Sequence, residues 1–190
     1  MTIEEWANMD EDEPGEFVDG YLVEEEVPIC AHEAIVSWFI GELRKWGKPK
    51  QAFVFSSDHK FALSPVRGRK PDVSMFAPRE RLPYNRALTR TPPRLMVEVL
   101  SATPRDVKRD RVEKMSEYAR FGVQSYWIVD PPNRSIECYE LGVDGRYSRA
   151  AMASQGQLVA PGFDNLVLDL DDLWGEVDLL SQDEDEPSET

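Results

Sequence analysis

The sequence predicts an α/β fold in which a mixed β-sheet is flanked by helices. Two strongly apolar segments, 94–100 and 125–130, have the composition of strands buried inside a sheet. A segment with apolar residues at helical spacing lies between them at 103–122, and strand-like segments follow at 135–141 and 147–152. Strands before and after one central helix, with a later ribbon of strands, indicate this class of fold.

The first half of the chain contains several short elements. We expect a turn-containing strand pair at 16–23, a helix at 31–46, a strand at 52–63, a turn at 66–69, a strand at 72–77 and a long loop at 78–93. The helix repeats apolar residues every three or four positions and ends before Gly47 and Pro49. The strand at 52–63 places three phenylalanines among polar residues.

The second half is built around the central helix. Thr103 before Pro104 is typical of an N-cap followed by proline in the first helical turn, and Gly122 is typical of a C-cap. A strand around 166–168 and a short helix near 171–180 are expected to close the fold.

The composition is that of one globular domain. The 190 residues include five Trp and eight Phe, enough for a sizeable core over residues 1–180, whereas residues 181–190 have the composition of a disordered acidic tail. No segment approaches the roughly 18 apolar residues that span a bilayer, and the first residues lack a basic region and an apolar signal core. We therefore expect a cytoplasmic protein with no membrane partner.

Charge is distributed unevenly along the chain. Residues 1–26 and 164–190 each contain 11 acids and no Lys or Arg, which leaves 14 acids against all 22 basic residues between them. The central segment therefore carries a charge of +8, although the whole chain carries −14. A basic centre suits a polyanion such as nucleic acid.

Three residues in this central segment are candidates for catalysis: Asp72, Glu98 and Lys114. Asp72 and Glu98 belong to two short apolar strands, and two such carboxylates can hold Mg²⁺ or Mn²⁺, with the Val99 carbonyl as a further ligand. Lys114 lies on the helix that follows and could orient a water or offset charge on a phosphate. The alternatives are purely structural roles: a backbone contact for Asp72, and an exposed ion pair between Lys114 and Asp110, four residues earlier.

Further residues could assist this chemistry. Glu16, His32 and Glu33 are candidate helpers, with either acid as a third metal ligand. The pair His32-Glu33 starts like a zinc-protease sequence, but Val36 stands where the second histidine would be. The basic residues expected to contact nucleic acid are Arg69, Lys70, Arg79 and Arg81, although a solvated loop is the default for the last two. No glycine pattern of a nucleotide-binding loop is present.

An ordered set of short segments resembles one protein family. The segments are 1–5, 16–20, 68–73, 98–101, 110–114, 126–131, 161–163 and 171–173, together with His32 and Tyr118. In this order they resemble the Uma-two family of PD-(D/E)XK restriction-endonuclease-like proteins. The resemblance implies a restriction-endonuclease-like fold with about four core strands between helices. It also implies a Mg²⁺- or Mn²⁺-dependent endonuclease that acts on nucleic acid, with DNA as the expected substrate, and that works as a homodimer.

Two positions depart from the usual pattern. A standard PD-(D/E)XK site has lysine two residues after the second acid, where this chain has Leu100; the family supplies lysine from the next helix, and Lys114 matches it. Ser125 stands where the family usually has Glu. A catalytically inactive nuclease-like domain used for binding or assembly therefore stays open as the alternative. A third reading, a protein-binding module, would depend on the acidic ends at 1–26 and 164–190.

Overall fold

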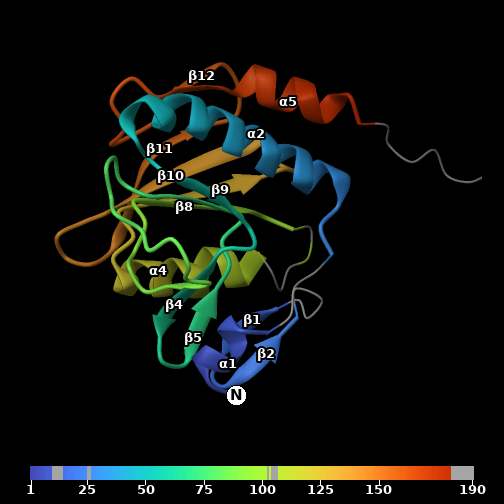
Figure 1. Ribbon diagram of the computed structural model, residues 1–190. Coiled ribbons are helices and arrows are strands. Elements are labelled where there is room, and N and C mark those ends of the chain that lie inside the picture. The colour runs from blue at the N-terminus through green and yellow to red at the C-terminus, as the bar shows by residue number, and fades with distance from the viewer. Residues whose placement is uncertain (10–14, 25–26, 102, 104–106, 181–190) are drawn as a thin grey trace, which may run out of the picture.

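The computed structural model describes residues 1–9, 15–24, 27–101, 103 and 107–180 of the chain. Its main feature is a six-stranded sheet in the order β11-β10-β9-β8-β6-β3 (Figure 1). The strands are β3 (Val54–Ser56), β6 (Val73–Met75), β8 (Leu95–Val99), β9 (Ser125–Asp130), β10 (Ser135–Leu141) and β11 (Tyr147–Ala153). β8 and β9 pair in parallel and the other neighbours pair antiparallel, so the sheet is mixed, as predicted.

The side chains of β8 alternate between two apolar layers. Val97 and Val99 pack in the cluster on one face of the sheet, whereas Met96 and Leu100 pack in the cluster on the other. Alternation places Glu98 on the same face as Met96 and Leu100. The sheet thus carries one carboxylate into an otherwise apolar layer.

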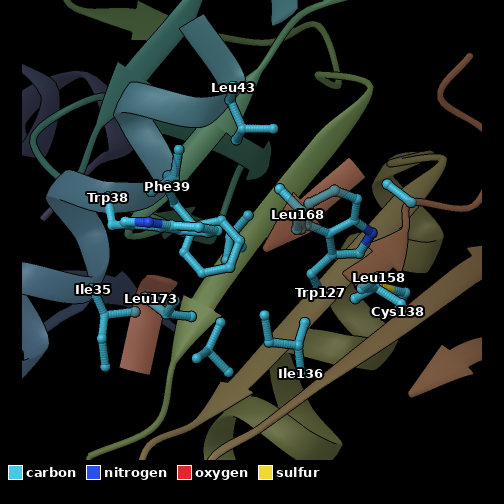
Figure 2. Close-up of a cluster of buried hydrophobic side chains, with 14 of the residues drawn as sticks. Ile35, Trp38, Phe39, Leu43, Trp127, Ile136, Cys138, Leu158, Leu168 and Leu173 are labelled. Atoms are coloured by element: carbon cyan, nitrogen blue, oxygen red, sulfur yellow. The ribbon is translucent and has the colours of Figure 1, made fainter. Parts of the chain in front are cut away.

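Two helices, α2 (Cys30–Gly47) and α5 (Leu170–Asp178), cover the face of Val97 and Val99 (Figure 1). Figure 2 shows the side chains that meet there, among them Ile35, Phe39 and Leu43 of α2, Trp127 of β9 and Leu173 of α5. These five side chains are fully buried, and burial of each stabilises the fold by about 1.5–3 kcal/mol. The hairpin of β12 (Gln157–Val159) and β13 (Val167–Asp169) leads into α5.

The opposite face is covered by the central helix and then by a second sheet. The helix consists of the π-helical segment η2 (Arg109–Lys114) followed by α4 (Met115–Phe121). The second sheet has the order β2-β1-β5-β4-β7. Its strands are β1 (Glu16–Val18), β2 (Tyr21–Val23), β4 (Lys60–Ser64), β5 (Arg67–Arg69) and β7 (Leu88–Thr89), and the short helices α1 (Ile3–Ala7) and η1 (Lys48–Lys50) complete the fold. In Figure 1 this second sheet lies below α4, on the side away from α2 and α5.

The predicted fold class and most predicted elements are confirmed, but three segments differ. The long loop expected at 78–93 contains the two-residue strand β7, which pairs in parallel with β4. The strand expected at 52–63 is two strands in different sheets, β3 and β4, because the chain turns after Ser56. The turn expected at 66–69 is largely β5, which pairs with both β1 and β4. A Cβ atom on Gly68 would lie 2.3 Å from the ring of Trp6, so glycine is required for β5 to pass beneath α1.

Some expectations fall outside the described residues. The tail at 181–190 and the helix start at Pro104 belong to this group. Within the part of the chain that the structure describes, no helix is long and apolar enough to cross a membrane.

Candidate functional site

Asp72 and Glu98 lie at the ends of neighbouring strands. β6 and β8 pair with Val73 opposite Val97, and the same register continued by one residue places Asp72 opposite Glu98. The Val99 backbone N–H donates a 2.7 Å hydrogen bond to Asp72 Oδ2. The structure therefore brings the two predicted acids together. Asp72 also makes the backbone contact that was expected if it had only a structural role.

Glu98 is held by two side chains of the central helix. Lys114 Nζ donates to Glu98 Oε2 at 2.9 Å, and the Tyr118 hydroxyl donates to Glu98 Oε1 at 2.5 Å. All three side chains are buried. The position of Lys114 is therefore the one that the departure at Leu100 predicted: the lysine reaches Glu98 from the helix rather than from β8.

The helix geometry brings further charge to the same point. Asp110, Lys114 and Tyr118 follow one another at intervals of four residues from the π-helical segment into α4, and π-helical segments often occur at functional sites. Asp110 Oδ1 lies 3.2 Å from Lys114 Nζ. Asp110 and Lys114 thus form the ion pair that their spacing suggested. Both residues are buried, so this is not an exposed ion pair on the helix surface.

The second sheet contributes an acid and a cation from the opposite side. Glu16 of β1 lies 3.6 Å from Lys114 Nζ through Oε1, and its Oε2 accepts a 2.5 Å hydrogen bond from Arg69 Nη1. Arg69 also donates to both carboxylate oxygens of Glu117, at 2.7 and 3.1 Å. Arg69 is fully buried, so our prediction that it contacts nucleic acid is wrong. Its guanidinium instead links β5 to β1 and α4.

The charged groups of this cluster shift one another's pKa values. Burial raises the pKa of Glu98 well above its usual range; Lys114 opposes this shift, and the charges of Asp110, Asp72 and Glu16 add to it. Burial would lower the pKa of Lys114, but the surrounding acids raise it well above the ordinary value. Lys114 is therefore charged at neutral pH, whereas Glu98 retains a proton more readily than an exposed glutamate does.

Glu16 behaves differently because it has two cationic partners. Burial would raise its pKa, but Lys114 and Arg69 outweigh burial and lower the pKa below the ordinary value. Glu16 is therefore ionised at neutral pH, and it stabilises the charged form of Lys114.

The residues present fit a divalent metal ion. Four carboxylates, those of Glu16, Asp72, Glu98 and Asp110, act on Lys114, so the cluster contains oxygen donors of the kind that such an ion takes. Mg²⁺ takes oxygen ligands and is commonly held by only one or two carboxylates together with waters. Among the described residues, no group of three or more His, Cys, Asp or Glu side chains is placed to hold a metal ion. A site here would thus rest on two carboxylates and waters.

The remaining predicted residues lie around this cluster. His32 of α2 places Nε2 at 3.3 Å from Asp72 Oδ1; burial opposes its protonation, but Asp72 raises the pKa of His32 above the ordinary value. Glu33 is 58% exposed and contacts His32 Nδ1 at 3.5 Å rather than the strand acids. The Lys70 backbone N–H donates to Glu16 Oε1 at 3.2 Å, which ties that segment to the cluster. Arg79 and Arg81 are exposed.

Sequence reasoning missed two members of the network. Tyr118 follows Lys114 by four residues, and this helical spacing could have linked its hydroxyl to the same acid. Glu117 had no such signal, because its partner Arg69 lies 48 residues earlier on a strand that was expected to be a turn.

Comparisons with known proteins agree with this architecture. A crystal structure from Anabaena variabilis ATCC 29413, described as a putative nuclease belonging to DUF820, superposes with a TM-score of 0.73 at 20% sequence identity, over 93% of this chain and 99% of the other. This likeness shows a shared fold. No curated protein matches the chain significantly. The model of the Uma2 (Uma-two) family, described as "putative restriction endonuclease", matches residues 2–171. Because this match covers most of the sequence, the chain belongs to the Uma2 family.

Proposed function

We propose that this protein is a Mg²⁺- or Mn²⁺-dependent endonuclease that hydrolyses phosphodiester bonds in DNA. One observation carries the proposal: Glu98, a carboxylate inside an apolar layer, lies opposite Asp72 and contacts both Lys114 and Tyr118. Burying a carboxylate or an ammonium group costs free energy unless the group is paired with an opposite charge or binds a metal ion. The fold of the Anabaena variabilis protein and the family match support a nuclease rather than another kind of hydrolase.

Asp72 and Glu98 would hold the metal ion, with the Val99 carbonyl as a further oxygen donor. A bound divalent ion supplies a more acidic water and stabilises charge on a phosphate. The Val99 N–H and His32 both contact the Asp72 carboxylate, so its orientation is set before any ligand arrives. Tyr118 has the same effect on Glu98 by donating to Oε1.

Lys114 would supply the positive charge of the site. Its ammonium holds its proton at neutral pH because the surrounding acids raise its pKa. A charged donor next to Glu98 can orient the attacking water and offset negative charge that develops on the phosphate. Arg69 and Glu16 act through Lys114, since Glu16 contacts both cations and keeps the ammonium charged. They are positioning residues rather than catalytic ones.

The proposal is tested by plasmid nicking. Purified protein is incubated with supercoiled plasmid and Mn²⁺, beside Glu98→Ala, Asp72→Asn and Lys114→Ala variants. The wild type is expected to convert plasmid to the nicked form and each variant to lose this activity. Glu113→Gln is the matched control, because Glu113 is an exposed acid next to Lys114 that belongs to no described contact of the site. It should nick like the wild type.

The outcomes separate the metal site from the lysine assignment. Nicking that survives Lys114→Ala but not Glu98→Ala would discard the role of Lys114 and leave the metal site standing. Nicking that survives Glu98→Ala would contradict the proposal itself. RNA of matching sequence in place of plasmid decides between the two nucleic acids.

A second candidate function is a catalytically silent nuclease-like domain used for binding or assembly. The observation that favours it is the closed arrangement of Glu98 and Lys114, both almost inaccessible to solvent and paired with each other. In that case Mn²⁺ should not bind in a titration, and Glu98→Ala should leave partner binding unchanged.

A further inference from the structure

Three rings form a ladder that begins at the edge strand of the large sheet. Phe53 and Phe55 stack nearly parallel, with ring centroids 6.3 Å apart and an interplanar angle of 11°. Phe55 stacks in turn on His59, at 4.5 Å and 28°. The inner rings are partly buried, but Phe53 at the outer end is 48% exposed. The ladder therefore presents an aromatic ring to solvent at a position fixed by the rings beneath it.

A basic loop is anchored to this ladder at both ends. At its start, the Phe76 N–H donates to the Phe53 carbonyl at 2.9 Å, and the Arg79 N–H donates to the Gln51 carbonyl at 3.0 Å. At its end, Thr89 of β7 lies 2.9 Å from His59 Nε2 through its hydroxyl. Residues 78–87 thus leave and rejoin the fold next to the stacked rings.

The loop carries three exposed arginines and one exposed aromatic residue. Arg79, Arg81 and Arg86 are exposed, and their guanidinium groups form no hydrogen bond or ion pair with the residues that the structure describes. Tyr84 between them is fully exposed. Such unpaired guanidinium groups can contact phosphates without losing an existing partner.

The ladder and the acid cluster share one face of the large sheet. Phe55 pairs with Ser74 of β6, and Ser74 pairs with Met96 of β8. Met96 and Glu98 are two residues apart on β8, so their side chains emerge on the same face. This face is covered by the central helix and the second sheet, so the ladder lies at the edge strand of the layer in which Glu98 is buried.

We infer that Phe53, with Tyr84 and the arginines of the 78–87 loop, is a binding site for unpaired bases of a DNA strand. Bases of an intact duplex are stacked on one another, so only an unpaired base can cover the exposed ring of Phe53. The arginines contact the phosphates on either side, as in other sites that combine stacking with cationic side chains. The inference deepens the proposed function, on which its choice of ligand rests: it assigns a preference for single-stranded or locally unpaired DNA.

The test measures binding and needs no catalysis. Fluorescence anisotropy with a fluorescein-labelled oligothymidylate and with a labelled blunt-ended duplex is carried out in EDTA, where no metal-dependent cleavage occurs. Phe53→Ala is expected to raise the Kd for the single strand at least about fivefold and to leave the duplex Kd within about twofold. Phe53→Leu should behave in the same way, because it keeps an apolar side chain but removes the ring. Phe53→Trp should restore wild-type binding.

Tyr21→Ala is the matched control, since Tyr21 is an aromatic residue that is 74% exposed on β2, within the acidic first segment. It should leave both affinities unchanged. Circular dichroism establishes that each variant is folded. Equal single-strand affinity in Phe53→Leu and the wild type, or an equal loss for strand and duplex, would overturn the inference alone. A wild type that binds neither probe would overturn the proposed function as well. An RNA strand of the same length, if bound as tightly as DNA, would overturn the choice of DNA.

Discussion

Removal of the buried ammonium by Lys114→Met should destabilise the fold far more than removal of an exposed one. Lys114 Nζ lies 2.9 Å from Glu98, 3.2 Å from Asp110 and 3.6 Å from Glu16. Methionine has a similar length and no charge, so the substitution leaves these buried acids without their common cation. Glu16 retains Arg69, but no second cation is seen against Glu98 among the described contacts.

The expected size follows from this loss of a partner. Removal of one member of a buried ion pair costs about 3–5 kcal/mol, because the remaining charge is left in a poorly solvated place. For a chain of this length, each 1 kcal/mol lowers Tm by about 2–4 °C, so a fall of roughly 6–20 °C is expected. The loss should shrink at low pH, because protonated acids no longer need a cation.

Urea unfolding followed by circular dichroism measures the free energy directly. Lys45→Met is the control, because Lys45 is 77% exposed and forms an exposed ion pair with Glu42 at 3.4 Å, and its loss should stay within about 0.5 kcal/mol. The double variant Lys114→Met/Glu98→Gln should be more stable than Lys114→Met alone, because one uncompensated acid is gone. A loss for Lys114→Met no larger than that of Lys45→Met would refute the assignment of a buried, charged lysine.

Three further predictions address other parts of the structure. Tyr118→Phe removes the hydroxyl that donates to Glu98 at 2.5 Å and should lower the free energy of unfolding by about 1–3 kcal/mol in urea titrations. Gly68→Ala should lower Tm, since overpacking beside Trp6 costs about 1–3 kcal/mol, whereas Gly175→Ala has nothing within 4 Å of its Cβ and should not destabilise. The proton on Glu98 stabilises the fold fully below the ordinary pKa of 4.5, and this contribution is lost as pH rises through the higher folded-state pKa. Glu98→Gln should flatten that decline above about pH 4.5, and an unchanged profile would count against the raised pKa.

The site was predictable where a local pattern conflicted with its surroundings. Glu98 interrupts an apolar strand, and such a conflict is informative because an ionised group there is costly. The structure places it next to Asp72 and Lys114, as the pairing of β6 with β8 and the crossover helix require. The large sheet was predictable from the apolar composition of its two central strands. β8 and β9 are buried at every residue, as that composition indicated.

The second sheet was not predictable from local signals. β5 is three residues long and contains two arginines and a glycine, a composition typical of a turn. It is a strand because β1 and β4, which are distant in sequence, supply its hydrogen-bonding partners. The same pairing buries Arg69 between Glu16 and Glu117, so an arginine that looks available to nucleic acid in the sequence is internal in the fold. Only long-range contacts distinguish it from Arg79.

The ionic character of the buried cluster bears on which function it serves. Buried ion pairs can often be replaced by apolar residues with no loss of stability, because desolvation offsets much of the attraction. The opposite face of the same sheet is packed in that apolar way, with Trp127 and Ile136 against α2 and α5. A domain that needed only a packed interface could have used such residues in place of Glu98 and Lys114. The charges of Asp110, Asp72 and Glu16 add to the cost of ionising Glu98, and a divalent cation beside Glu98 would relieve this repulsion. Metal binding would account for a carboxylate placed in an apolar layer opposite Asp72, and for this reason we favour the nuclease over the silent scaffold.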